Sequence, residues 1–216
     1  MASLTLAPFG LRVSRLKSGA AANYEGEKYL IGKGYTSAIA RGDLVYTLPS
    51  GAFQGYIAPY AEGGTHVLGV FMGVGPYYDT VSGPQPGKQA WYGTESPSTD
   101  VVAYICDDPT AILLAQVSGG PATYADRGKN IDFGGGGAPN SAGLSVGYLD
   151  YTTVSTTNSA GALRIVGFSP TMTGGASPFD PTLPSTYGAT TNQPTNNWLE
   201  VIFNPYFFEH YLGTGY

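Results

Sequence analysis

Residues 101–117 read VVAYICDDPTAILLAQV. Two apolar runs, residues 101–106 and 111–117, flank the polar sequence DDPT. The proline of that sequence fixes its own φ angle, and the two aspartates can accept hydrogen bonds from the turn backbone. The stretch therefore predicts a β-hairpin, and it makes an all-β fold the first hypothesis for the rest of the chain.

Glycine and proline break the whole chain into short pieces. Among 216 residues there are 32 Gly and 16 Pro, about twice their usual combined share of ~12%. The longest stretch without either, residues 148–160, is crowded with Thr and Ser, which disfavour helix. Because an average helix needs ~11–12 residues, we expect no more than a helical turn or two, near residues 20–25 or 123–127.

Strand signals are frequent instead. Besides the hairpin, runs rich in β-branched and aromatic residues occur at residues 35–40, 43–48, 54–59, 66–74, 89–92, 144–149, 151–156, 162–168 and 198–203. Several short strands at regular spacing are typical of sandwiches and barrels. We therefore predict that residues 19–216 form a single domain, an antiparallel β-sandwich or barrel with long irregular loops.

Three segments are longer than ordinary turns, which have ~4–6 residues. They are residues 81–97, 134–143 and 169–197. The last contains five prolines and the apolar side chains Met172, Phe179 and Tyr187, which can lie on a partner. We expect that the core requires none of these segments and that a partner binds there.

Residues 1–18 are expected to form an extended N-terminal arm. Pro8 prevents a continuous central strand, so two interpretations stay open. The arm adds to the sheet edge or groove of a neighbouring molecule, or it is an edge strand of its own domain. Under the first interpretation, deletion of residues 1–15 weakens partner binding and leaves the fold intact. The candidate partner-binding residues of the arm are Leu4, Leu6, Phe9, Leu11 and Arg12.

The charge of the chain excludes one class of partner. There are 10 basic and 15 acidic residues, for a net charge of −5, and no basic cluster is denser than Arg12, Arg15 and Lys17. We therefore expect no nucleic-acid partner. Charged residues make up only 12% of the chain, roughly half the usual ~25%, which fits a surface that is covered by a partner.

The location of the protein follows from what the sequence lacks. No run approaches the ~18 apolar residues of a membrane span, and the N-terminus has no basic region typical of a signal peptide. The single cysteine, Cys106, lies in an apolar run and is expected to be buried. We therefore expect no membrane partner and synthesis in a cytoplasm.

One pattern of catalytic type occurs, Gly143-Leu144-Ser145-Val146-Gly147, which matches the G-x-S-x-G nucleophile elbow. That elbow needs a helix directly after the serine, whereas the sequence here continues as a strand. We interpret the match as coincidence and predict no enzyme and no catalytic residue. The chain has no paired metal-ligand spacing, and its glycine run lacks the Lys-Ser/Thr of a phosphate loop. We therefore predict no metal and no cofactor.

The aromatic residues leave two alternatives. The chain has 17 Tyr, 9 Phe and 2 Trp, which argues against disorder. Pairs such as Trp91-Tyr92 can stack on sugars, or they can lie in the core or at a protein interface. Trp91 and Tyr92 are therefore added to the candidate partner-binding residues.

Several phrases of the sequence resemble the head decoration (cement) proteins of tailed bacteriophages. They are LTLAPFGLR (4–12), HVLGVFMGV (66–74), TDVVAYICDDP (99–109), and LRIVGF (163–168) followed by NWLEVIFN (197–204). The resemblance implies a non-enzymatic protein on the capsid exterior of the virion, made in the host cytoplasm. It implies binding to the major capsid protein and self-association, commonly as a homotrimer.

The resemblance also implies what such a protein does. It docks on the outside of an expanded head and clamps neighbouring capsid subunits together. The alternative is a head fibre or receptor-binding protein that recognises host-surface glycans through its aromatics, with loss of binding in Trp91→Ala as its test. A hydrolase built on Ser145 is a third hypothesis, and we do not expect it.

Overall fold

The computed structural model describes residues 8–20, 26–168 and 198–209. Within these ranges the regular secondary structure is almost entirely β-strand, so the all-β prediction is confirmed. The 3₁₀ turn η1 (Tyr124–Asp126) lies wholly within the described residues, inside one of the two places where the sequence allowed a helical turn. None of the helical structure described is long and apolar enough to cross a membrane.

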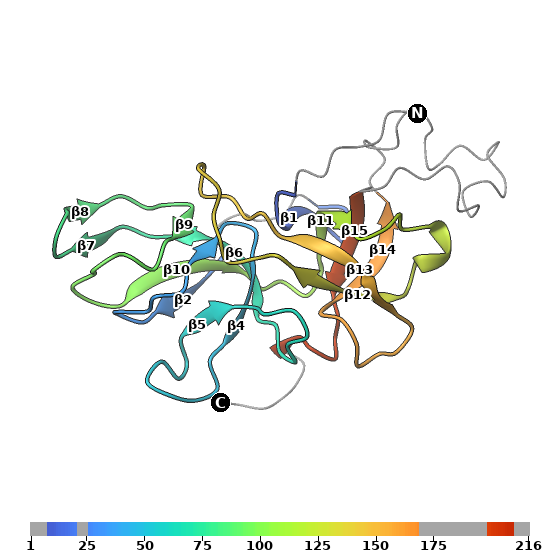
Figure 1. Cartoon of the computed structure of the whole chain (residues 1–216), viewed down its shortest axis with the longest axis horizontal. Coiled ribbons are helices and arrows are strands. Elements are labelled where there is room, and N and C mark those ends of the chain that lie inside the picture. Colours follow the sequence, from blue (N-terminus) through green and yellow to red (C-terminus); the bar gives the residue numbers. More distant parts are fainter. Residues whose placement is uncertain (1–7, 21–25, 169–197, 210–216) are drawn as a thin grey trace.

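The strands are short and lie in two groups (Figure 1). In chain order they are β1 (Arg12–Leu16), β2 (Glu27–Ile31), β3 (Ile39–Ala40), β4 (Leu44–Thr47), β5 (Ile57–Pro59), β6 (Gly69–Val74), β7 (Tyr77–Asp79), β8 (Gly83–Gln85), β9 (Ala90–Trp91), β10 (Val101–Cys106), β11 (Ala111–Ser118), β12 (Asn130–Gly134), β13 (Tyr148–Ser155), β14 (Leu163–Phe168) and β15 (Trp198–Phe203). We call β2–β10 the sheet half, and β1 with β11–β15 the barrel half.

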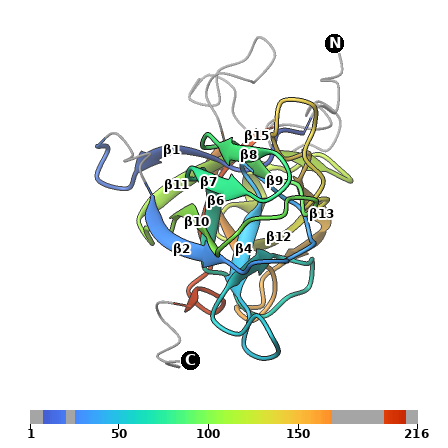
Figure 2. The same ribbon diagram turned by 90° about the vertical axis from the view of Figure 1, so that its left-hand side faces the viewer.

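The sheet half is built on a five-stranded antiparallel sheet in the order β2-β10-β6-β4-β5. Its two outer strands, β2 and β5, approach each other, so the sheet is strongly curled. Two small sheets, β3-β9 and β7-β8, complete this half. The β7-β8 hairpin lies at the end of the molecule away from the barrel and faces the viewer in Figure 2.

The barrel half closes on itself. Its strand order is β1-β11-β13-β12-β14-β15, and β11 also pairs with β15. Strands β11, β13, β12, β14 and β15 therefore form a closed five-stranded barrel, with β1 added beside β11. The β11–β13 pair is parallel, and the other pairs of this sheet are antiparallel.

The predicted hairpin at residues 101–117 is wrong in one respect. Both strands and the turn are present, and Ala111 N–H donates to the Asp108 carbonyl oxygen at 3.0 Å. However, β10 pairs with β2 and β6, whereas β11 pairs with β1, β13 and β15. Other strands thus pair with both edges of β10 and of β11, so these two strands do not pair with each other. The turn between them carries the chain from the sheet half to the barrel half.

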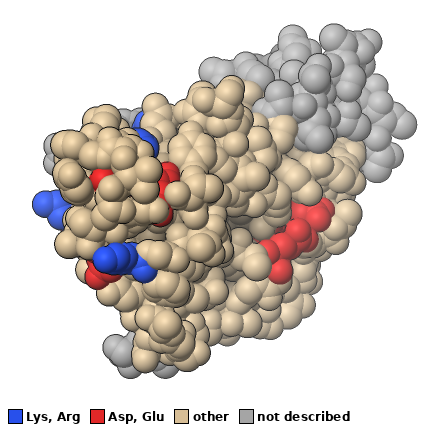
Figure 3. All heavy atoms as spheres, turned by 60° about the vertical axis from the view of Figure 1, so that its left-hand side comes forward, with Lys and Arg blue, Asp and Glu red and all other residues tan. Residues whose placement is uncertain are grey.

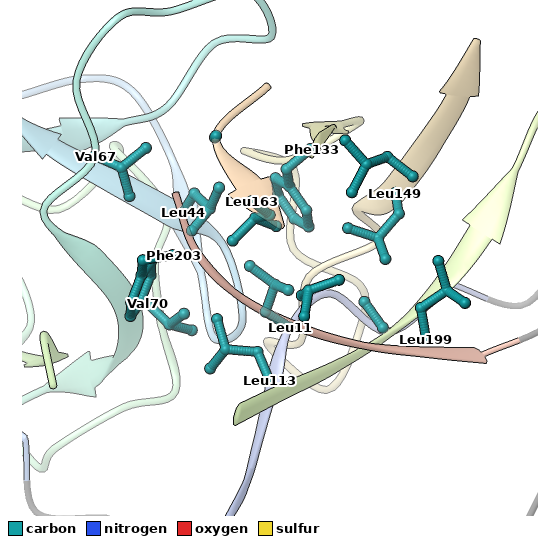
Figure 4. Close-up of a cluster of buried hydrophobic side chains, with 14 of the residues drawn as sticks. Leu11, Leu44, Val67, Val70, Leu113, Phe133, Leu149, Leu163, Leu199 and Phe203 are labelled. Atoms are coloured by element: carbon teal, nitrogen blue, oxygen red, sulfur yellow. The ribbon is translucent and has the colours of Figure 1, made fainter. Parts of the chain in front are cut away.

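The two halves share one apolar interior. The larger cluster of buried side chains draws members from both, including Leu44, Val67, Val70, Leu113, Leu163, Leu199 and Phe203, which converge in Figure 4. Cys106 is buried in this cluster, as predicted. A second cluster, which includes Ile31, Phe71 and Trp91, fills the sheet half alone.

Two of the three long segments are more ordered than the sequence suggested. Residues 81–97 contain β8 and β9, and Trp91 of β9 is buried in the second cluster, so the expectation that the core does not need this segment is wrong. In residues 134–143, Gly137 N–H donates to the buried Asp43 at 2.9 Å, which ties this segment to the sheet half. Residues 169–197 lie outside the described residues.

Candidate functional site

A pocket of about 350 Å³ lies where the N-terminal segment passes between the two halves. We call it the junction pocket, and its lining residues are Phe9, Leu11, Arg12, Val13, Arg41, Met72 and Leu144. They come from the N-terminal segment with β1, from β6 and the β3–β4 loop of the sheet half, and from the loop before β13. The volume lies within the ~300–1,000 Å³ of ordinary ligand pockets.

Gly10 allows the N-terminal segment to enter this junction. Its N–H donates to the Gly147 carbonyl oxygen at 3.0 Å, and the next N–H, of Leu11, donates to the Gly42 carbonyl oxygen at 2.8 Å. Gly10 has φ +70°, and a Cβ there would lie 2.4 Å from the Cβ of Ser145. Only glycine fits such a position, so this residue fixes how Phe9 and Leu11 reach the pocket.

A buried pair of side chains holds the surrounding loops. Ser145 donates its hydroxyl proton to Asp43, and the Ser145 Oγ accepts the Gly147 N–H at 2.9 Å. Asp43 also accepts the N–H groups of Ala40, at 2.7 Å, and of Gly137. Burial raises the pKa of the Asp43 carboxyl above its ordinary value, although its three hydrogen bonds act in the opposite direction.

These contacts give the G-x-S-x-G segment a structural account. Ser145 is 0% exposed, and the chain continues from Gly147 directly into strand β13 rather than into a helix. The ring of Phe133 would lie 2.2 Å from a Cβ at Gly147, so that glycine is required for packing. His66 forms a hydrogen bond through its Nδ1 with the Oγ1 of the neighbouring Thr65. Ser145 and Gly147 thus shape the loop that brings Leu144 to the pocket.

Aromatic packing positions Arg12 at the mouth of the pocket. Its guanidinium carbon lies 4.4 Å from the centre of the Phe9 ring. The Phe9 ring in turn packs edge-on against Trp198 of β15, with 4.6 Å between ring centres. A cation over an aromatic face is attracted by the ring quadrupole, so Phe9 supports both the apolar wall and the charge.

The two arginines of the pocket have no acidic partner within the described ranges. The ion pairs recorded there are Arg15–Glu200 and Lys129–Asp126, each with a shortest N···O distance below 3 Å. Neither involves Arg12 or Arg41. The pocket therefore combines an apolar lining with two guanidinium groups that are not neutralised by a neighbouring described carboxylate.

The structure places the predicted partner-binding residues in different environments. It brings Phe9, Leu11 and Arg12 together in the junction pocket, with Leu11 buried at 3% exposure. Residues 12–16 form β1, so for them the interpretation as an edge strand of their own domain applies. The other arm and loop candidates, Leu4, Leu6, Met172, Phe179 and Tyr187, lie outside the described residues.

Trp91 and Tyr92 do not form a joint stacking surface. Trp91 is 0% exposed, and its indole N–H donates to the Tyr35 carbonyl oxygen at 3.1 Å. Tyr92, the next residue, is exposed. The sequence reasoning missed Arg41, Met72 and Leu144, because they are far apart in the chain and only the tertiary fold brings them to one pocket.

Buried carboxylates make the exterior poorer in charge than the composition alone implies. Four aspartates, Asp43, Asp79, Asp126 and Asp132, are buried. In the face seen in Figure 3, the remaining charged side chains form small groups separated by wide uncharged areas. Large apolar or aromatic side chains are exposed at Leu30, Tyr78, Val81, Tyr92, Tyr124, Val146 and Tyr206.

The pocket offers groups that can contact a ligand. Its lining offers apolar surface and guanidinium donors, and it contains no hydroxyl, thiol, imidazole or carboxylate side chain. Across the described part of the chain, no group of three or more His, Cys, Asp or Glu residues is placed to hold a metal ion. No family model, curated protein or solved structure matches this chain, so its fold and its pocket are established from its own geometry.

Proposed function

We propose that this chain is a capsid decoration protein. It binds the outside of a phage head and clamps neighbouring major capsid protein subunits, which stabilises the shell. The observation that supports this proposal most is the exterior, which is poor in charge and carries exposed tyrosines on both halves of the molecule.

The charge content of the surface argues for extensive coverage. A typical soluble surface is ~25–35% Lys, Arg, Glu and Asp, whereas this chain is 12% charged in total and buries four of its aspartates. Protein interfaces are depleted in Lys, Glu and Asp and enriched in Tyr. The exterior thus has the composition of a surface that is buried on assembly.

The exposed aromatic and apolar residues are spread over the molecule. Tyr78 and Val81 lie on or beside the β7-β8 hairpin, Tyr124 begins η1, and Tyr206 follows β15. Several separate contacts suit a protein that touches more than one subunit of a lattice. The resemblance to decoration proteins further implies that the chain forms a homotrimer. In a trimer the weak contacts of the three copies are linked, which raises avidity by ~10²–10⁴.

Co-sedimentation tests the proposal. Capsids assembled from the major capsid protein of the same genome are mixed with the purified chain, both as precursor shells and as expanded shells. We expect saturable binding to expanded shells and a higher temperature of shell disassembly. If expanded shells bind no more of the chain than an unrelated protein of similar size does, the proposal is wrong. Light scattering of the free chain checks the expected trimer.

A further inference from the structure

The junction pocket carries positive charge on an otherwise apolar lining. Five of its seven lining side chains are apolar, and the other two are Arg12 and Arg41. An occupant that is only apolar leaves both guanidinium groups without an anionic partner among the described residues, and an occupant that is only charged leaves the apolar lining in contact with water. The lining therefore matches a ligand that joins an anionic group to an aliphatic body.

Arg12 is arranged to bind a carboxylate. Its guanidinium carbon lies over the Phe9 ring, which restricts the side chain, and among the described residues no ion pair engages its N–H groups. Those N–H groups match the two oxygens of a carboxylate in a paired geometry. Because Trp198 supports Phe9, this arrangement is present before any ligand binds.

Arg41 supplies a second charge from a fixed backbone. Its N–H donates to the Gly143 carbonyl oxygen at 3.1 Å, and its carbonyl oxygen accepts the Ser145 N–H at 2.9 Å. Its side chain is half-buried and lines the same pocket as Arg12. Two like charges that line one pocket create a local positive potential, although the whole chain has a net charge of −5.

The overall negative charge restricts the kind of anion. A chain with net charge −5 repels a polyanion such as nucleic acid, whereas a single carboxylate feels mainly the two nearby arginines. We propose that the junction pocket binds an extended segment of a partner protein in which an Asp or Glu stands beside a Leu, Ile or Val. The partner's identity, the major capsid protein, rests on the proposed function. The chemistry of the segment rests on the pocket.

A peptide panel tests the inference. Overlapping 12-residue peptides of the major capsid protein are titrated into the ¹³C-methyl-labelled chain. We expect binding by peptides with an acidic residue beside an aliphatic one, with shifts of the Met72 and Leu144 methyl resonances. Replacing that Asp or Glu by Asn or Gln, or changing Arg12→Gln or Arg41→Gln, is expected to weaken binding about tenfold or more.

Arg127→Gln is the matched control, because Arg127 is an exposed arginine outside the pocket. It is expected to leave peptide affinity unchanged, and circular dichroism checks that every variant is folded. The inference is wrong if no peptide binds. It is also wrong if the peptides with Asn or Gln in place of Asp or Glu bind as tightly as the acidic peptides, or if Arg12→Gln and Arg41→Gln both bind peptides like wild type. Tighter binding of free hexanoate than of any peptide also contradicts it.

The capsid assay separates this inference from the proposed function. If Arg12→Gln with Arg41→Gln abolishes peptide binding and weakens binding to expanded shells, both stand. If wild-type protein binds shells but no peptide, the pocket inference fails and the proposed function remains. If wild-type protein binds acidic peptides in the pocket but no shells, the chemistry of the pocket stands and the proposed function fails.

Discussion

Ser145 donates a hydrogen bond to Asp43, which lies 102 positions earlier in the chain. The two side chains are 0% and 1% exposed. This contact joins the loop before β13 of the barrel half to the β3–β4 loop of the sheet half. A buried carboxylate with satisfied hydrogen bonds is tolerated, whereas loss of one partner leaves a costly unpaired group.

Ser145→Ala is expected to lower the free energy of unfolding by about 1–3 kcal/mol. The change removes the hydroxyl donor of Asp43 and the acceptor of the Gly147 N–H. Urea unfolding followed by fluorescence measures the effect. Val146→Ala, at the exposed neighbouring position, is the control and should change stability by no more than about 0.5 kcal/mol. A fully stable Ser145→Ala variant would contradict this structural role.

Leu11→Ala is expected to lower the free energy of unfolding by about 2–5 kcal/mol, the usual range for a buried leucine. Leu11 belongs to the shared core cluster. Ser14→Ala, at an exposed position of β1, should have almost no effect. Urea unfolding of both variants tests whether the N-terminal segment is part of the folded core.

The same contacts change the design of an arm deletion. Removal of residues 1–15 deletes most of β1 together with the core residues Leu11 and Val13. We therefore expect that truncated chain to be unfolded by circular dichroism, rather than folded and weakly binding. Removal of residues 1–7 deletes neither β1 nor a lining residue of the pocket, so it is the truncation with which the arm hypothesis can be tested on capsids.

Trp91→Ala is expected to lower the free energy of unfolding by about 3–5 kcal/mol. The variant loses a fully buried indole and the hydrogen bond to the Tyr35 carbonyl oxygen. Thermal unfolding measures the effect, and Tyr92→Ala serves as an exposed control. A glycan signal lost in Trp91→Ala would therefore indicate unfolding, so Tyr92→Ala is the variant that can test the glycan alternative. Unchanged stability of Trp91→Ala would contradict the buried position.

Asp79 should make the β7-β8 hairpin sensitive to acid. The Ser96 N–H, with the N–H groups of Ser82 and Val81, lowers the pKa of its carboxyl below the ordinary value of 3.8. A lowered folded-state pKa gives stability that is complete above the unfolded pKa and is lost as the pH falls through the folded value.

The stability difference between wild type and Asp79→Asn should therefore be largest at neutral pH and shrink as the pH falls below about 4. Urea unfolding at a series of pH values measures that difference. Because the other carboxyls are present in both proteins, their titration contributes equally to both and cancels in the difference. A difference that stays constant down to pH 2 would contradict the role of the charged Asp79.

The sequence predicted strands better than their pairing. The apolar runs of β6, β10, β11, β14 and β15 were all identified, because burial on a pleated sheet requires such residues. The predicted pairing of β10 with β11 was wrong, because the residues of a turn show where a chain reverses and do not show which strand edges already have a partner. Residues 144–149 and 151–156, predicted as two strands, form the single strand β13 and a loop.

Strands β2, β7, β8 and β12 lie outside the runs predicted as strands, and β2 and β12 were missed for a common physical reason. Strand β2, EKYLI, is charged at its start, and β12, NIDFG, contains the polar residues Asn130 and Asp132. Asp132 is buried because the Tyr60 hydroxyl and the Gly63 N–H of the sheet half donate to it at 2.8 and 2.6 Å. Such a carboxylate is satisfied only by distant residues, so no local pattern reveals that its strand is internal.

The candidate site was predictable only where its residues are sequence neighbours. Phe9, Leu11 and Arg12 stood out as an apolar segment with a charge, and all three line the pocket. Arg41 gave no signal, since a single arginine beside a glycine is common in turns. Leu144 was noticed only at the start of a predicted strand and within a catalytic pattern, whose serine donates a hydrogen bond to the buried Asp43.

The pairing of β1 with β11, through Arg12 opposite Leu114 and Leu16 opposite Ala111, has a consequence for synthesis. Strand β1 must wait for a partner that is made about a hundred residues later, after every strand of the sheet half. At ~5–20 residues per second this delay is about 5–20 s. During that time Leu11 and Val13 have no barrel to pack against, so the beginning of the chain is among the last parts to reach its native place.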